Sequence, residues 1–165
     1  LLAHERMSGG SLGTHKTLLR QLKQIAKDDE VSAGRPLAED PDFAREIAKI
    51  ELELRTLEAF NLRALDKMSK KGALGSQALG TEANLFKVRN TEIHQRLTEL
   101  KMLAIGYYAN PYLLNALSHG WNEPPVGAEY ANGVTPSYLH FRKVSIYSGS
   151  NEIQRNIIAK AQLGL

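Results

Sequence analysis

The sequence predicts an all-α domain, an up-down four-helix bundle whose fourth helix is broken. Apolar residues recur at steps of three and four over three long segments. No stretch shows the strict apolar-polar alternation of a half-buried strand, and proline and glycine gather between the periodic segments. Three long helices and a broken fourth are enough for such a bundle. The length of 165 residues suits one domain, taken as residues 1–165.

Two helices are expected in the first half of the chain. The first runs from the start to about Lys27, and Gly9, Gly10 and Gly13 weaken its first half. A polar loop follows over residues 28–40. The second helix has an N-cap and a proline at its first position in Asp40-Pro41. It ends at Lys70-Lys71-Gly72, which places cations in the last turn and a glycine after it.

The second half begins with a connection over residues 72–80. A third helix is expected from near Thr81 to about Tyr108. Residues 118–136 are rich in proline and glycine and form the longest irregular segment. A short helix over residues 137–147 and another over residues 151–163 then make up the broken fourth helix.

Composition excludes several classes of function. The net charge of +3 is well mixed along the chain and gives no argument for a nucleic-acid or membrane partner. The chain has no cysteine, so it has neither disulfides nor thiolate metal sites, and its five histidines are not paired on one helical face. No metal site is therefore expected. Apolar runs are shorter than a membrane span, and the start does not look like a secretory signal, so a cytoplasmic location is the default expectation.

The most informative segment is residues 147–155, which joins the two pieces of the fourth helix. Gly149 and Ser150 form the break, and the hydroxyl of either Ser148 or Ser150 can cap the helix that follows. The N-terminus of that helix favours anionic or polar ligand groups.

This segment resembles the terminal signature of the acyl-CoA dehydrogenases, which usually reads Tyr-Glu-Gly-Thr-x-x-Ile-Gln-Arg. The chain has Tyr147-Ser148-Gly149-Ser150-Asn151-Glu152-Ile153-Gln154-Arg155. The resemblance implies the C-terminal helical domain of a flavoenzyme that dehydrogenates an acyl-CoA thioester with FAD as its cofactor. In many members the glutamate of the signature is the catalytic base, and here Ser148 stands in its place.

The missing carboxylate directs attention to Glu5. Some members of the family carry the base on the first bundle helix, within a Glu-Arg pair, and His4-Glu5-Arg6 stands where that pair would be. The resemblance therefore implies that Glu5 removes the α-proton of the thioester. Arg6, which points about 100° away on a helix, would hold the turn of Tyr147, Ser148 and Gly149. By residue type alone, Glu5 and Arg6 would be ordinary surface residues.

The cofactor contacts match the family less closely. Ser150 and Glu152 stand at positions that resemble contacts to the adenosine side of FAD, and Glu152 introduces a charge there. Alternatively, Ser150 is only a helix cap and Glu152 a solvated first-turn residue. The family's Arg-x-x-Phe-Gly motif is replaced at Glu30 and Ala33, with Arg35 as a substitute cation. Asn122-Glu123 lies where the family has a glycine-rich stretch, and a loop role is favoured over a cofactor contact.

The abrupt start of the chain suggests a piece of a longer enzyme, because an N-terminal helical domain and a middle β-domain precede this region in the family. Alone, the chain is expected to be inactive, with little or no FAD. The resemblance implies an acyl-CoA substrate, an electron-transfer flavoprotein as electron acceptor, and a homodimer or homotetramer. Two alternatives remain: a base-deficient partner subunit of a heteromeric dehydrogenase, in which Ser148 marks a lost site, and a non-catalytic helical interaction module.

Overall fold

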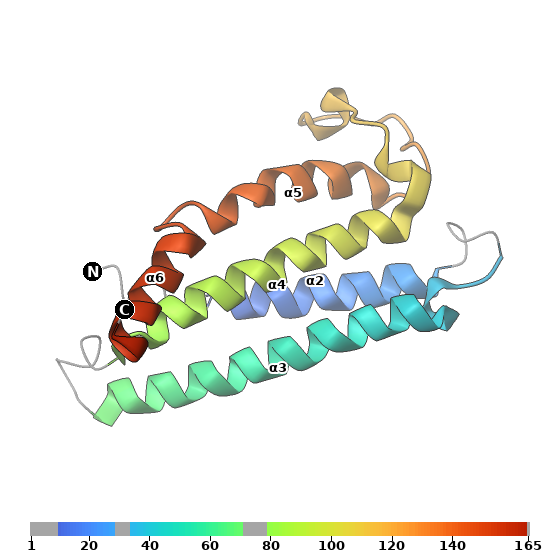
Figure 1. Cartoon of the computed structure of the whole chain (residues 1–165). Coiled ribbons are helices and arrows are strands. Elements are labelled where there is room, and N and C mark those ends of the chain that lie inside the picture. Colours follow the sequence, from blue (N-terminus) through green and yellow to red (C-terminus); the bar gives the residue numbers. More distant parts are fainter. Residues whose placement is uncertain (1–9, 29–33, 71–78, 165) are drawn as a thin grey trace. The chain divides into compact units, whose positions relative to one another are not determined.

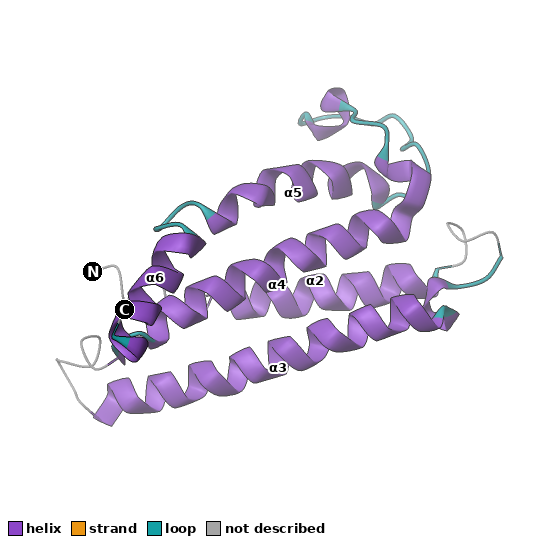
Figure 2. Cartoon of the chain, in the orientation of Figure 1, coloured by secondary structure: helices purple, strands orange, loops and turns teal. Residues whose placement is uncertain are grey.

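The structure is a computed structural model that describes residues 10–28, 34–70 and 79–164. The ordered elements in these ranges are helices, without a strand among them (Figure 2), so the predicted all-α class is confirmed. The α-helices shown in Figure 1 are α2 (Gly10–Lys27), α3 (Pro41–Lys70), α4 (Glu82–Ile105), α5 (Val134–His140) and α6 (Asn151–Leu163).

The chain forms two compact units. Of the described residues, unit 1 holds 10–16, 51–70, 79–94 and 143–164, whereas unit 2 holds 17–28, 34–50 and 95–142. The turn that carries the terminal signature therefore belongs to unit 1, together with α6 and the first half of α4.

The first two described helices follow the sequence prediction. α2 ends at Lys27, and it is helical from Gly10 despite its glycines. α3 begins after Asp40, whose Oδ1 accepts hydrogen bonds from the backbone N–H groups of Asp42 at 3.0 Å and Phe43 at 2.8 Å. Such a cap contributes about 1 kcal/mol, so local sequence fixes where this helix starts.

α4 is the most enclosed helix of the described chain. Only Leu85, Arg89 and Leu103 are exposed along it, which explains why its sequence has no wide polar face. It ends at Ile105, short of the predicted Tyr108, because Gly106 adopts a left-handed conformation with φ 55°. Residues Gly106–Ala109 then tighten into a 3-10 turn.

The fourth helix is broken, as the sequence predicts, but its first piece starts earlier. α5 begins at Val134 instead of residue 137. Pro136 is the third residue of α5, within the first turn, where backbone N–H groups have no partner inside the helix. The proline therefore does not delay the helix. A 3-10 segment, Phe141–Ser145, follows directly.

The two units have different interiors. Unit 2 buries aliphatic residues together with Thr98 and Thr135, whose hydroxyls donate to the backbone carbonyls of Gln95 and Ala109. Unit 1 buries many more polar side chains among its described residues, namely His15, Asn61, Asn84, Lys87, Thr91, His94, Asn151 and Gln154. The unit that carries the signature therefore has the polar core.

Two glycines are expected to respond oppositely to alanine. Gly13 is exposed within α2, and a Cβ there meets no atom within 4 Å, so Gly13→Ala should raise the free energy of unfolding by about 0.5–1 kcal/mol. Gly127 has φ 86°, and its Cβ would lie 2.3 Å from Cδ1 of Tyr108. Gly127→Ala should therefore lower the same free energy by more than about 1 kcal/mol. Urea unfolding of both variants measures the two effects, and equal effects would contradict this assignment.

Candidate functional site

The terminal turn, residues 146–150, joins the 3-10 segment Phe141–Ser145 to α6. Residues 146–149 are exposed, and the Tyr147 side chain keeps 51% of its surface in solvent. Ser148 (φ 57°) and Gly149 (φ 86°) are consecutive left-handed residues, and Ser148 is the only non-glycine of the described chain with a positive φ. That conformation costs a serine about 1–2 kcal/mol, so the turn needs support from its surroundings.

Ser150 caps α6. Its backbone is extended (φ −61°, ψ 156°), and its Oγ accepts a hydrogen bond from the Ile153 N–H at 3.4 Å. Of the two serines that the sequence offers as caps, the structure therefore uses Ser150. The cap uses only the oxygen of the hydroxyl, and the hydroxyl proton is donated to the Glu152 carboxylate.

Glu152 lies exposed in the first turn of α6. Hydrogen bonds from its own backbone N–H and from the Ser150 hydroxyl lower the pKa of Glu152, and the positive charges of Arg155 and Lys87 add to the shift. Glu152 is therefore ionised at neutral pH and can only accept hydrogen bonds. Arg155 in turn forms an ion pair with Glu92 of α4.

Lys87 supports the terminal turn and was missed by the sequence analysis. Its side chain lies on α4 and is only 5% exposed. Its ammonium donates to the Ser145 carbonyl at 3.1 Å and to Asn151 Oδ1 at 2.8 Å. These two acceptors lie immediately before and after the turn, so one cation contacts both of its ends.

Thr91 also contacts the side-chain amide of Asn151. Because Lys87 can only donate, Oδ1 of Asn151 accepts from it, and Thr91 Oγ1 lies 3.0 Å from Nδ2 and 3.1 Å from Oδ1. The Thr91 hydroxyl directs its proton to the Val88 carbonyl at 2.9 Å and can therefore accept from Asn151. A sequence signal existed: Asn84, Lys87, Thr91 and His94 follow one another at helical steps of three and four.

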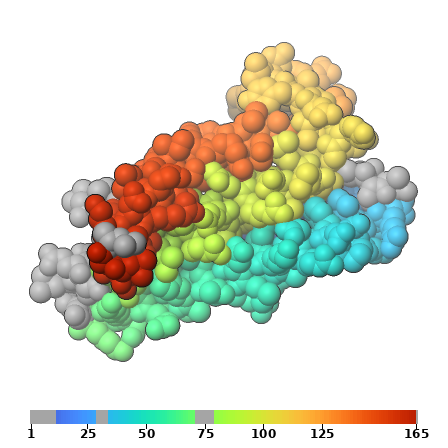
Figure 3. Space-filling model, viewed as in Figure 1, coloured from blue at the N-terminus to red at the C-terminus, as the bar shows by residue number. Residues whose placement is uncertain are grey.

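α6 packs against the first part of α4 through these contacts and through more exposed ones. In Figure 3 the surface of α6 (red) adjoins that of the first part of α4 (yellow-green). Near the end of α6, Gln162 Nε2 donates to Thr81 Oγ1 at 3.0 Å. The Thr81 hydroxyl, next to the start of α4, thus anchors the last helix.

A buried histidine pair lies in the same unit. His15 of α2 and His94 of α4 meet through Nε2 and Nδ1 at 3.0 Å, with His15 fully buried. One ring must donate and the other accept, so the pair is stable only while at least one ring is neutral. Burial and, to a smaller extent, the neighbouring His94 lower the pKa of His15 to about 4.

Several predicted site residues are not brought to this turn by the described structure. Glu5, Arg6, Glu30 and Ala33 lie outside the described residues. Arg35 is exposed and forms an ion pair with Glu39 at 3.6 Å, in unit 2.

Asn122 and Glu123 are also in unit 2, exposed in an irregular loop. That placement agrees with the loop role favoured for them. Their cofactor contact, like that of Arg35, stays a prediction.

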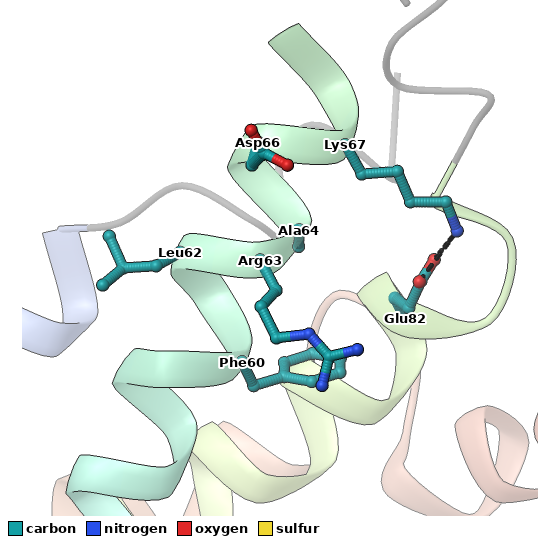
Figure 4. Close-up of a pocket in the computed structure, with 7 residues that line it drawn as sticks. All are labelled: Phe60, Leu62, Arg63, Ala64, Asp66, Lys67 and Glu82. Carbon is teal, nitrogen blue, oxygen red and sulfur yellow. Dashed lines mark hydrogen bonds and ion pairs between the residues drawn. The ribbon is translucent and has the colours of Figure 1, made fainter. Parts of the chain in front are cut away.

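A cavity at the end of α3 is lined mainly by charged residues and lies apart from the terminal signature. It has a volume of about 570 Å³ and is lined by Phe60 and by charged residues that include Asp66 and the Lys67–Glu82 ion pair (Figure 4). None of its lining residues belongs to the terminal signature. The described part of the chain contains no cluster of three potential metal ligands, and no helix in those ranges is both long and apolar enough to span a bilayer.

The described residues form an all-helical domain with an exposed turn before a capped last helix. The sequence profile of the family "Acyl-CoA dehydrogenase, C-terminal domain" matches residues 1–163. The chain therefore belongs to this family. Among curated protein sequences, none matches the chain.

Solved structures with the same fold include dehydrogenases. Butyryl-CoA dehydrogenase from Megasphaera elsdenii aligns with a TM-score of 0.68 at 18% identity, over 98% of this chain and 37% of that one. The ChsE4-ChsE5 complex from Mycobacterium tuberculosis aligns at 0.62 and 21% identity, over 92% and 35%. A variant of the Tcur3481-Tcur3483 steroid ACAD aligns at 0.66 and 18% identity, over 99% and 38%. The chain thus spans little more than a third of each of these structures.

Acidification is expected to lower the free energy of unfolding, because the unfolded chain protonates His15 more readily than the folded chain does. The unfolded chain protonates His15 near pH 6.5, whereas the folded chain resists protonation until about pH 4. Stability is therefore full above about pH 6.5 and is lost progressively toward pH 4, by up to about 3 kcal/mol. Denaturant titrations at several pH values in this range measure the slope of the free energy of unfolding against pH. His15→Gln should flatten it, and the exposed His119→Gln should not; a slope unchanged in His15→Gln would exclude His15 as its source.

Proposed function

We propose that this chain is the C-terminal domain of an FAD-dependent acyl-CoA dehydrogenase, in which it takes part in the α,β-dehydrogenation of an acyl-CoA thioester. The observation that carries the proposal is the terminal turn. It keeps Tyr147, Gly149 and the Ile153–Arg155 end of the family signature, in a chain whose family match extends over residues 1–163. The acyl-CoA substrate, an electron-transfer flavoprotein as acceptor, and inactivity of this chain by itself are parts of the same proposal.

The residues at the start of α6 fit a contact with the adenosine side of FAD. The Ser150 hydroxyl can donate to a ligand in place of Glu152, and the ionised Glu152 carboxylate can accept from a ribose hydroxyl. The N-terminus of α6 also offers backbone N–H groups to polar ligand atoms. In α,β-dehydrogenation, FAD would supply the group that accepts the hydride leaving the β-carbon of the thioester. Ser150 and Glu152 would hold and orient the cofactor.

The proton of the α-carbon needs a base, and Ser148 does not provide one, because a serine hydroxyl is not appreciably ionised near neutral pH. Glu5 is the carboxylate we propose for this task. A dry pocket would raise its pKa toward the working pH. Arg6 would hold the backbone of Tyr147 and Gly149 so that the base and the turn line the same cleft.

Replacing the base tests this assignment in the full-length enzyme. Glu5→Gln should lower kcat by at least about 100-fold while FAD remains bound, because the proton transfer loses its acceptor. Adding Ser148→Glu to that variant should restore part of the activity, since it returns a carboxylate to the usual position of the family. Stopped-flow reduction of the flavin measures the step directly.

The matched control is Glu129→Gln, which removes an exposed carboxylate of the loop in unit 2. It should leave flavin reduction unchanged. Full turnover of Glu5→Gln would rule out Glu5 as the base.

A second candidate is a base-deficient subunit of a two-chain dehydrogenase. Ser148 favours it, and two of the similar structures carry names with two components. In that case Glu5→Gln leaves turnover of the assembled enzyme unchanged, whereas a base variant of the other chain abolishes it. A third candidate is an interaction module without catalysis, and finding FAD in the full-length protein would contradict it.

We also propose that copies of the chain associate through the α3–α4–α6 face of unit 1. Two shallow grooves lie there, of about 370 Å³ between α3 and α4 and about 440 Å³ between α4 and α6. Both are lined by Leu85 and Arg89. Arg89 pairs with Glu53 and Glu92, so the face offers apolar surface with balanced charges, which suits a self-complementary contact.

Leu85→Glu should weaken this association. Leu85 lines both grooves, and a charge at this position would lose its water in the contact between copies. The average mass measured by light scattering should therefore fall toward that of the monomer. Leu103→Glu is the control, because Leu103 is also exposed on α4 but belongs to unit 2. An unchanged mass of Leu85→Glu would exclude this face.

A further inference from the structure

The ammonium of Lys87 lies where the two ends of the terminal turn come together. It bonds the last residue of the 3-10 segment, through Ser145 O at 3.1 Å, and the first residue of α6, through Asn151 Oδ1 at 2.8 Å. All three residues belong to unit 1. The donor is separated from its acceptors by 58 and 64 residues along the chain, so the contact is purely tertiary.

We propose that Lys87 is a positioning residue of the dehydrogenase: its ammonium holds both ends of the terminal turn and thereby sets the position of the backbone at residue 148 in the active site. This inference rests on the proposed function. Lys87 is buried beneath the turn and acts through the chain that it anchors, without touching the reacting atoms.

The turn needs such an anchor because of its own conformation. Residues 146–149 are exposed, and Ser148 and Gly149 take consecutive left-handed conformations. Exposed residues of this kind contribute little packing, so the path between Ser145 and Asn151 depends on how firmly its ends are held. Lys87 fixes both ends relative to α4.

The anchor is itself well determined. The Lys87 side chain is 5% exposed and the Asn151 side chain 3% exposed. Thr91 Oγ1 lies 3.0 Å from Asn151 Nδ2, from which it accepts, and 3.1 Å from Oδ1, which accepts from the ammonium. The contact thus joins a lysine and a threonine of α4 to one asparagine of α6.

The decisive variants are Lys87→Met, which keeps length and loses the ammonium, and Thr91→Val, which keeps the ammonium and loses the acceptor for Asn151. In the flavin-loaded full-length enzyme, Lys87→Met should lower kcat about 10- to 100-fold, with KM changed less than about 3-fold, because misplaced active-site groups slow the chemical step. Thr91→Val should lower kcat about 3-fold. Lys67→Met, which removes the exposed Lys67–Glu82 pair of the same unit, should leave kcat unchanged.

A second readout follows the turn directly. Hydrogen exchange of amides 146–153 should become at least about 10-fold faster in Lys87→Met, while the amides of α3 keep their wild-type rates. Faster exchange over the whole of unit 1, with unchanged kcat per bound flavin, would mean that Lys87 is merely structural and would overturn the proposal. If Lys87→Met does not fold, Thr91→Val decides by the same two measurements.

These outcomes separate the two proposals. An enzyme that binds FAD and oxidises acyl-CoA, but whose Lys87→Met and Thr91→Val variants keep the wild-type kcat, overturns the positioning role and leaves the proposed function intact. Absence of turnover in the unchanged full-length protein overturns the proposed function, and the positioning role with it.

Discussion

The burial of a positive charge on α4 is the constraint on which the end of unit 1 depends. An ammonium removed from water needs oxygen acceptors, since an unpaired charge in the interior costs several kcal/mol. The carbonyls of α4 are already engaged within the helix. Lys87 therefore takes its acceptors from Ser145 and Asn151. These contacts hold the residues on both sides of the break against α4.

Local signals made the long helices predictable. The start of α3 could be read from Asp40-Pro41, because the cap and the first helical residue are neighbours in the chain, and the structure has both. The start of α5 could not, since Pro136 can end a helix or stand in its first turn, and only the surrounding packing selects between these. The choice of Ser150 over Ser148 as the cap likewise followed from the backbone conformation at the turn.

The sequence identifies the segment that carries the candidate site, but it does not identify the residues that support this segment. The signature of residues 147–155 is contiguous, so a single sequence reveals it. The residues that hold it come from α4 and are distant in the chain. Lys87 and Thr91 fall within a helical pattern in which polar residues are ordinarily assigned to solvent. Here they face α6, and a helix enclosed on nearly all sides gives no polar face that would indicate which polar residues are buried.

The backbone conformation of Ser148 shows why the turn needs the support of α4. A left-handed residue other than glycine or asparagine is held there against its own preference, so the turn keeps a specific backbone although its side chain carries no carboxylate. If the turn served only to connect two helices, glycine would fit it with less strain. We propose that the turn forms a wall of the active site, and the strain at Ser148 supports this role because strained residues cluster at functional sites. A carboxylate supplied by another segment, as we propose for Glu5, would then meet a wall whose position the α4 contacts already fix.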